Sequence, residues 1–199
     1  MRSIPLTAVL GCLGLSLLLV GCDRQDQPQP PQSPAEPQAH ADEQVEQVAD
    51  QAIPESLPTV DADAIHAMVA ETAETERITV IDFWATWCIP CVAMFPELHQ
   101  GLVQMGERVR PISITLDGPG ESEEAAIAFL NRQNALKDAY LLEPDSDAQV
   151  QVAQSIGENW NSLVVPAIFV YDQNGNLAGE FFDGDASKIL QRVSELLAQ

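Results

Sequence analysis

The sequence predicts an α/β protein in which a central mixed β-sheet is flanked by helices. Segments with the period of a strand alternate with segments with the period of a helix through residues 59–199. The last two strand patterns are separated by an Asn-Gly pair, which is typical of a hairpin turn. All 3 Trp, 2 Tyr and 6 Phe residues also lie in this part of the chain, so residues 59–199 are expected to form the folded domain.

Apolar spacing predicts the elements in the first half of this domain. Ile65, Met68 and Val69 fall on one side of a helix, and Leu98 and Leu102 repeat that spacing in a second one. Mostly apolar runs without this spacing predict buried strands. The expected elements are a helix over Asp61–Glu74, a strand over Ile78–Trp84, a helix over Cys88–Gly106 and a strand over Val109–Leu116.

Terminal signals predict the elements in the second half. Three acidic residues from Glu121 onward suit the start of a helix, because they face the positive end of its dipole. Gly157 ends a short helix, and Asn174-Gly175 forms the hairpin turn. The expected elements are helices over Glu121–Ala135, Asp147–Ile156 and Ala186–Leu197 and strands over Ala139–Leu142, Pro166–Asp172 and Leu177–Phe182.

Residues 1–21 have the composition of a signal peptide, with a basic start and an uncharged apolar run over Ile4–Val20. The run ends in Leu19-Val20-Gly21-Cys22, which resembles the bacterial lipobox and implies that Cys22 is lipidated. The sequence thus predicts a lipid-anchored protein of the bacterial cell envelope, and Asp23 favours the inner membrane, facing the periplasm. An uncleaved anchor helix is the alternative, since seventeen residues are at the lower limit for crossing a bilayer.

Residues 22–58 are expected to form an acidic, disordered linker. Residues 23–58 contain seven of the 14 prolines, eight glutamines and no aromatic residue. Such a composition buries too little apolar area to offset the entropy of the chain. The linker would let the domain at 59–199 move over a membrane surface.

The charge excludes a nucleic acid partner. The chain has 9 Lys+Arg against 30 Asp+Glu, a formal net charge of −21, which repels phosphates at long range. The domain at 59–199 is itself acidic, with 7 Lys+Arg and 22 Asp+Glu residues. The clustered acids after Glu121 are interpreted as a helix start, and no metal site is predicted.

The four cysteines differ in context. Cys12 lies in the signal peptide and Cys22 at its end, which leaves Cys88 and Cys91 as Cys-Ile-Pro-Cys between a predicted strand and a predicted helix. At the start of a helix, free N–H groups and the dipole stabilise a thiolate, so this pair is predicted to be redox-active. A structural disulfide and half of a zinc site are the alternatives. The first closes too short a loop to stabilise the domain much, and the second needs about four ligands.

Two segments resemble the thioredoxin superfamily. Val80–Cys91 (Val-Ile-Asp-Phe-Trp-Ala-Thr-Trp-Cys-Ile-Pro-Cys) looks like its active-site segment, and Val164–Gly175 is similar to its cis-proline strand and hairpin. The stretch Glu121–Gly157 resembles the helical insertion of the TlpA/ResA branch, which consists of membrane-tethered, extracytoplasmic thiol–disulfide oxidoreductases. The resemblance implies a thioredoxin-like fold without a cofactor other than a redox-active Cys88–Cys91 disulfide. It also implies disulfide-bearing protein substrates, apocytochrome c among them, and an electron donor in the membrane.

The resemblance and the chemistry together assign roles. Cys88 is the expected nucleophile, Cys91 resolves the mixed disulfide, and Asp82, amid apolar neighbours, is the expected general base with a pKa raised by burial. Trp87, Val165 and Pro166 are expected to bind substrate, and the bond before Pro166 is expected to be cis. Some members carry a glutamate three residues after the second cysteine. Met94 stands there, so that feature is not carried over.

Other activities remain open from the sequence. A thioredoxin-like thiol peroxidase would carry a proline upstream of its cysteine, and a copper-handling chaperone would space its cysteines one residue further apart. A redox-inert adhesion module would not need both cysteines. The direction of electron flow is also open: the Ile-Pro pair lacks the histidine of some strongly oxidising relatives, which favours a reductant over an oxidant.

Overall fold

The computed structural model describes residues 53–160 and 162–199. The predicted signal peptide, the predicted lipidation site at Cys22 and most of the predicted linker lie outside these residues. None of the helices in the described part of the chain combines the length and the apolar character that crossing a membrane requires.

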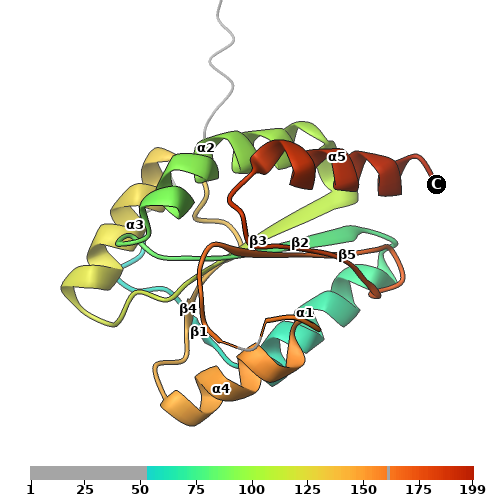
Figure 1. The fold of residues 1–199 in the computed structure, drawn as a ribbon. Coiled ribbons are helices and arrows are strands. Elements are labelled where there is room, and N and C mark those ends of the chain that lie inside the picture. The colour runs from blue at the N-terminus through green and yellow to red at the C-terminus, as the bar shows by residue number, and fades with distance from the viewer. Residues whose placement is uncertain (1–52, 161) are drawn as a thin grey trace, which may run out of the picture. The chain divides into compact units, whose positions relative to one another are not determined.

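A mixed six-stranded sheet forms the centre of the domain (Figure 1). The strands lie in the order β1-β4-β3-β2-β5-β6. β1, β4, β3 and β2 run parallel to one another, whereas β5 is antiparallel to β2 and β6 is antiparallel to β5. The strands are β1 (Thr59–Val60), β2 (Ile78–Trp84), β3 (Val109–Thr115), β4 (Ala139–Leu142), β5 (Ala167–Tyr171) and β6 (Leu177–Phe181).

Helices cover both faces of the sheet, which completes the predicted α/β architecture. α2, α3 and α5 lie on one face, and α1 and α4 lie on the other (Figure 1). A short 3-10 helix, η1, follows α2. The helices are α1 (Ala62–Glu74), α2 (Ile89–Gln104), η1 (Gly106–Arg108), α3 (Glu121–Arg132), α4 (Ser146–Ser155) and α5 (Ala186–Leu197).

The core has a separate layer on each face of the sheet. On the α1 and α4 face, Phe83 packs against Trp160 with ring centroids 4.6 Å apart and against Phe169 at 5.7 Å. On the other face, Trp84 packs against Phe95 of α2 at 5.3 Å and Phe129 of α3 at 5.0 Å. Since successive residues of a strand face opposite sides, β2 supplies aromatic rings to both layers.

All the predicted helices and strands are present, several with shifted ends, and two short elements, β1 and η1, were not predicted. α3 ends at Arg132 and not at Ala135, because Asn134 takes a left-handed φ of 54°, which no helix continues. β1 is absent from the prediction, since two residues are too few to show a period. The ordered fold begins before Thr59: Leu57 is buried, and its N–H donates to the Glu123 carboxylate at 2.7 Å.

Candidate active site

β2 carries the chain to the cysteine pair. All seven of its residues are buried, because β3 and β5 flank it and helices cover both faces. At its end, the Trp84 indole donates to Ser113 Oγ at 2.7 Å and anchors the last residue of the strand to β3. The following loop places Cys88 at the N-cap of α2.

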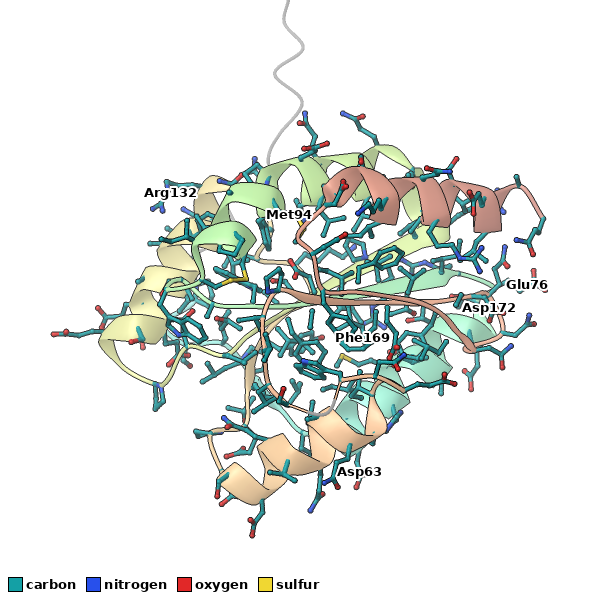
Figure 2. All side chains as sticks on the ribbon, viewed as in Figure 1. Asp63, Glu76, Met94, Arg132, Phe169 and Asp172 are labelled. Carbon is teal, nitrogen blue, oxygen red and sulfur yellow. A yellow bond between two sulfur atoms is a disulfide. The ribbon has the colours of Figure 1, made fainter. Side chains whose placement is uncertain are left out.

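Cys88 and Cys91 are joined as a disulfide at the start of α2 (Figure 2). The Cys91 N–H points at Cys88 Sγ, with the nitrogen 3.3 Å from the sulfur. Cys88 is 5% exposed and Cys91 is fully buried, so the first sulfur is the one nearer to the surface. Pro90 occupies the first turn of the helix, where its missing N–H leaves no hydrogen bond unmade. The predicted strand–Cys-x-x-Cys–helix arrangement is confirmed.

Asp117 fixes the loop before Cys88 to β3. Its buried carboxylate accepts from the Thr86 N–H at 2.8 Å, from Thr86 Oγ1 at 2.6 Å and from Thr115 Oγ1 at 2.6 Å. The loop therefore approaches the helix N-terminus in one geometry. Asp117 could not be predicted from the sequence, because it is 29 residues after Cys88 and belongs to neither of the two recognised segments.

Replacing Asp117 with alanine is expected to lower the free energy of unfolding by about 3 kcal/mol. The buried Thr115 hydroxyl and two partly buried donors of Thr86 would lose their acceptor, and each such loss costs about 1–3 kcal/mol before the loop relaxes. Urea unfolding followed by circular dichroism measures the change. Asp117→Asn keeps one acceptor oxygen, so its free energy of unfolding should lie between those of the parent and the alanine variant. An alanine variant as stable as the parent would show that the network does not hold the loop.

Asp82 is buried on the α2 face of β2, beside Phe95 and Leu98. Burial raises the pKa of its carboxyl from 3.8 to about 7, because a charge in an apolar interior is poorly solvated. Its Oδ1 has no hydrogen-bond partner among the residues described. The predicted burial and raised pKa are confirmed, and a carboxyl with this pKa exchanges protons readily near neutral pH.

The segment before β5 lies close to the helix start and is partly exposed. The Val165–Pro166 bond is cis, as expected, and Val164 is 63% exposed. The Trp160 indole donates to the Val164 carbonyl at 3.0 Å and holds this segment against the core. Gly184 joins the two regions, since a methyl group on it would lie 3.5 Å from Pro166 and 3.8 Å from Pro90.

The other predicted binding residue, Trp87, lies on the surface. It is 64% exposed, and Ile89 on the other side of Cys88 is 82% exposed. Trp87 and Ile89 are the sequence neighbours of a cysteine that is itself nearly buried, and Val164 is an exposed apolar residue of the segment that Gly184 links to Pro90; these three residues are called the apolar rim below. An apolar rim around a concealed reactive atom suits contact with a protein segment. Met94 faces away from the rim and packs with the α5 residues Ile189 and Val193 (Figure 2).

The acidic residues at the start of α3 do not form a metal site. Glu123 is buried and accepts from Leu57, whereas Glu121 and Glu124 are exposed. Throughout residues 53–160 and 162–199, no group of three or more His, Cys, Asp or Glu side chains is arranged to hold a metal ion. The redox-active group that this geometry offers is the disulfide itself.

Comparison with known proteins finds a family match over the part of the chain that contains Cys88 and Cys91. Residues 57–123 match the family model described as Thioredoxin. Thioredoxin of Bacillus subtilis (strain 168) is 38% identical over 56 residues, which are 28% of this chain and 51% of that protein. Thioredoxin of Listeria monocytogenes is 34% identical over 47 residues, covering 24% and 46%. The chain thus spans about half the length of the curated relatives it matches.

Solved structures extend the likeness to most of the domain. A thioredoxin-family thiol:disulfide interchange protein from Chlorobium tepidum TLS has a TM-score of 0.52 and 17% identity over 72% of this chain and 98% of that one. A thioredoxin-like superfamily protein has a TM-score of 0.51 and 17% identity over 66% and 85%. At these identities the likeness shows the fold, which is thioredoxin-like as the sequence predicted.

Proposed function

We propose that this protein is a thiol–disulfide oxidoreductase that reduces disulfides in other proteins. The observation that carries the proposal is the Cys88–Cys91 disulfide at the N-terminus of α2, where the Cys91 N–H points at the Cys88 sulfur. The same N–H and the helix dipole would stabilise a Cys88 thiolate once the disulfide is reduced. The match of residues 57–123 to the Thioredoxin family model supports this chemistry.

In the first step, the Cys88 thiolate of the reduced enzyme attacks one sulfur of a substrate disulfide. A bond forms between Cys88 Sγ and that sulfur, the substrate S–S bond breaks, and the other substrate sulfur leaves as a thiolate. The surface position of Cys88 relative to Cys91 determines which sulfur attacks, because a protein substrate reaches only the outer one.

In the second step, Cys91 attacks Cys88 Sγ and releases the reduced substrate. Cys91 must first lose its proton, and Asp82 accepts it through a water molecule. The products are the Cys88–Cys91 disulfide and a substrate dithiol, so the two electrons come from the enzyme dithiol. An electron donor in the membrane then reduces the enzyme again.

Substrate would bind along the apolar rim and the segment before β5. The backbone of Val165, next to Pro166, would pair with an extended substrate segment as an added strand does, and Trp87 would contact the substrate side chains. The exposure of Val164 and Trp87 supports this arrangement.

The proposed location is the bacterial cell envelope. Lipidation at Cys22 would anchor the chain in the inner membrane, and residues 22–58 would hold the domain in the periplasm. Keeping the cysteines of apocytochrome c reduced is the proposed task within the TlpA/ResA branch. The lipobox-like end of the apolar run and the resemblance described above support these assignments.

The test is disulfide reduction by the purified, reduced protein. Insulin should precipitate faster as more of the reduced protein is added. Equilibration with glutathione should give a reduction potential near −270 mV, about that of thioredoxin. A potential near −120 mV would instead indicate an oxidant. If the protein did not reduce insulin, consumption of peroxide would favour a thiol peroxidase. Tight copper binding would then favour a copper-handling chaperone.

A further inference from the structure

A small inner cavity lies beside the Asp82 carboxylate, between β2, β3 and α2. Its volume is about 20 Å³, which is enough for one water molecule. Asp82 and Ser113 are register partners on neighbouring strands, so both side chains face α2. A water molecule there has the Ser113 hydroxyl and the unpartnered Asp82 Oδ1 as hydrogen-bond partners. The inner cavity is lined by Val80, Asp82, Phe95, Leu98, His99, Leu102, Pro111, Ile112, Ser113, Ala135 and Lys137.

A second, outer pocket of about 370 Å³ shares three of these lining residues, His99, Pro111 and Lys137. His99 and Lys137 line both spaces and are the polar groups between them. The outer pocket also contains three charged groups from other elements, which are Arg77 before β2, Glu107 of η1 and Asp138 before β4. The charged and titratable groups along this line are therefore Asp82, His99, Lys137, Arg77, Glu107 and Asp138.

The surroundings of His99 suit proton transfer. The ring stacks on Phe95, with centroids 5.6 Å apart and planes at 15°, and Phe95 is one helical turn after Cys91. Burial lowers the pKa of His99, and a hydrogen bond with the Asn134 backbone opposes that effect. A neutral imidazole accepts a proton at one nitrogen and releases one from the other. Lys137 is exposed, so its stem lines the cavity while its ammonium reaches water.

The proposed reaction needs such a path. Asp82 takes the Cys91 proton while substrate is still bound to Cys88, and a bound substrate covers the surface at Trp87 and Val164. The proton then has to leave on another side before the next turnover. The inner cavity meets that need because it lies one helical turn away from Cys91, along α2.

We propose that the opening between His99 and Lys137 is the path by which Asp82 exchanges its proton with solvent, through one water molecule in the inner cavity. Asp82 gives its proton to the water, and the water gives one to the free nitrogen of His99. The other nitrogen of His99, which is hydrogen-bonded to the Asn134 backbone at the outer pocket, releases one to solvent there. No electron moves, and the imidazole is again neutral but in its other tautomer, which proton exchange of the ring with solvent converts back. The role of this path in turnover rests on the proposed function, but the path itself does not.

The experiment follows hydrogen–deuterium exchange of the Asp82 carboxyl in the oxidised protein. At about pH 5, below the pKa of about 7, the carboxyl is protonated, and its infrared C=O band is identified by its loss in Asp82→Asn. Rapid mixing with D2O shifts this band. His99→Phe keeps the ring stacking and removes the transferable proton, so exchange should slow by about tenfold or more. Adding Lys137→Met to His99→Phe should slow the exchange further.

The chain offers a matched control for each change. His66 is exposed on α1, on the other face of the sheet, and Lys188 is exposed on α5. His66→Phe and Lys188→Met should leave the exchange rate unchanged. His99→Ala with imidazole in the buffer should recover the wild-type rate, which a purely structural role of His99 does not predict.

Wild-type exchange in both His99→Phe and Lys137→Met, each folded by circular dichroism, would overturn the path. Should His99→Phe fail to fold, His99→Gln removes the same transferable proton with a smaller change of shape and decides the matter. Insulin reduction by the same samples separates the two proposals. An inactive wild-type protein that keeps the His99 dependence contradicts the function, and an active one without that dependence contradicts the path.

Discussion

Replacing Asp82 with asparagine is expected to stabilise the protein at pH 8 by up to about 4 kcal/mol. The carboxyl has a pKa of about 7 in the folded protein and 3.8 when it is unfolded and solvated. A difference of about 3 pH units corresponds to about 4 kcal/mol, because each unit is worth about 1.4 kcal/mol. Asparagine fills nearly the same space and has no charge to bury.

The sign follows from the proton count. Between about pH 4 and pH 7 the folded protein holds a proton on Asp82 that the unfolded chain has released. Stability therefore falls as the pH rises through this window, and the full cost is present above the folded pKa. Below about pH 4 the Asp82 carboxyl is protonated in both the folded and the unfolded protein. The stability of the parent protein and that of Asp82→Asn should therefore change with pH in the same way there.

Urea unfolding of both proteins at pH 4, 6 and 8 measures the effect. The difference in the free energy of unfolding should be small at pH 4 and grow steadily to pH 8. Asp63→Asn, an exposed change on α1, is the control and should show no such growth. A constant difference across the three pH values would mean that Asp82 is not desolvated.

The same variant should lose activity while it gains stability. Asparagine accepts no proton from Cys91, and removal of a general base costs about 10²-fold or more in the step that it serves. Insulin reduction at pH 7 should therefore fall even though less of the protein is unfolded. A stabilised, inactive variant is the expected mark of a carboxyl that is retained for its chemistry.

The part of the site that could be predicted from the sequence lies in two continuous segments. Cys88 and Cys91 follow a buried strand, and Asp82 stands inside that strand among apolar residues, so local pattern alone indicated their surroundings. The cis bond before Pro166 followed from the resemblance of its segment. Each of these features is determined within about a dozen residues of chain.

The parts that were missed depend on contacts between distant segments. Asp117 meets Thr86 only because β3 lies beside β2, and Leu57 meets Glu123 across 66 residues. His99 belongs to no sequence motif, and its place in the helix shows no role until Asp82 and Lys137 are found to line the same cavity. Periodicity shows which face of a helix is buried, but it does not show which polar groups that face meets.

Replacing either cysteine with serine should abolish disulfide reduction, but the two variants should fail at different steps. Cys88→Ser lacks the outer nucleophile, and the fully buried Cys91 is out of reach of a protein substrate. This variant should therefore form no covalent complex at all. The loss of turnover should exceed about 10³-fold, as expected when the atom that forms the covalent intermediate is removed.

Cys91→Ser keeps the Cys88 nucleophile at the start of α2 and loses only the group that attacks it. It should accumulate a mixed disulfide with substrate, visible by non-reducing electrophoresis and mass spectrometry and released by dithiothreitol. Adduct on Cys91 in the Cys88→Ser protein would reverse the assigned roles. Full insulin reduction by Cys88→Ser would refute the proposed function. The two serine variants serve as each other's control. Each replaces one cysteine sulfur with oxygen, the two positions are three residues apart, and both variants lose the disulfide.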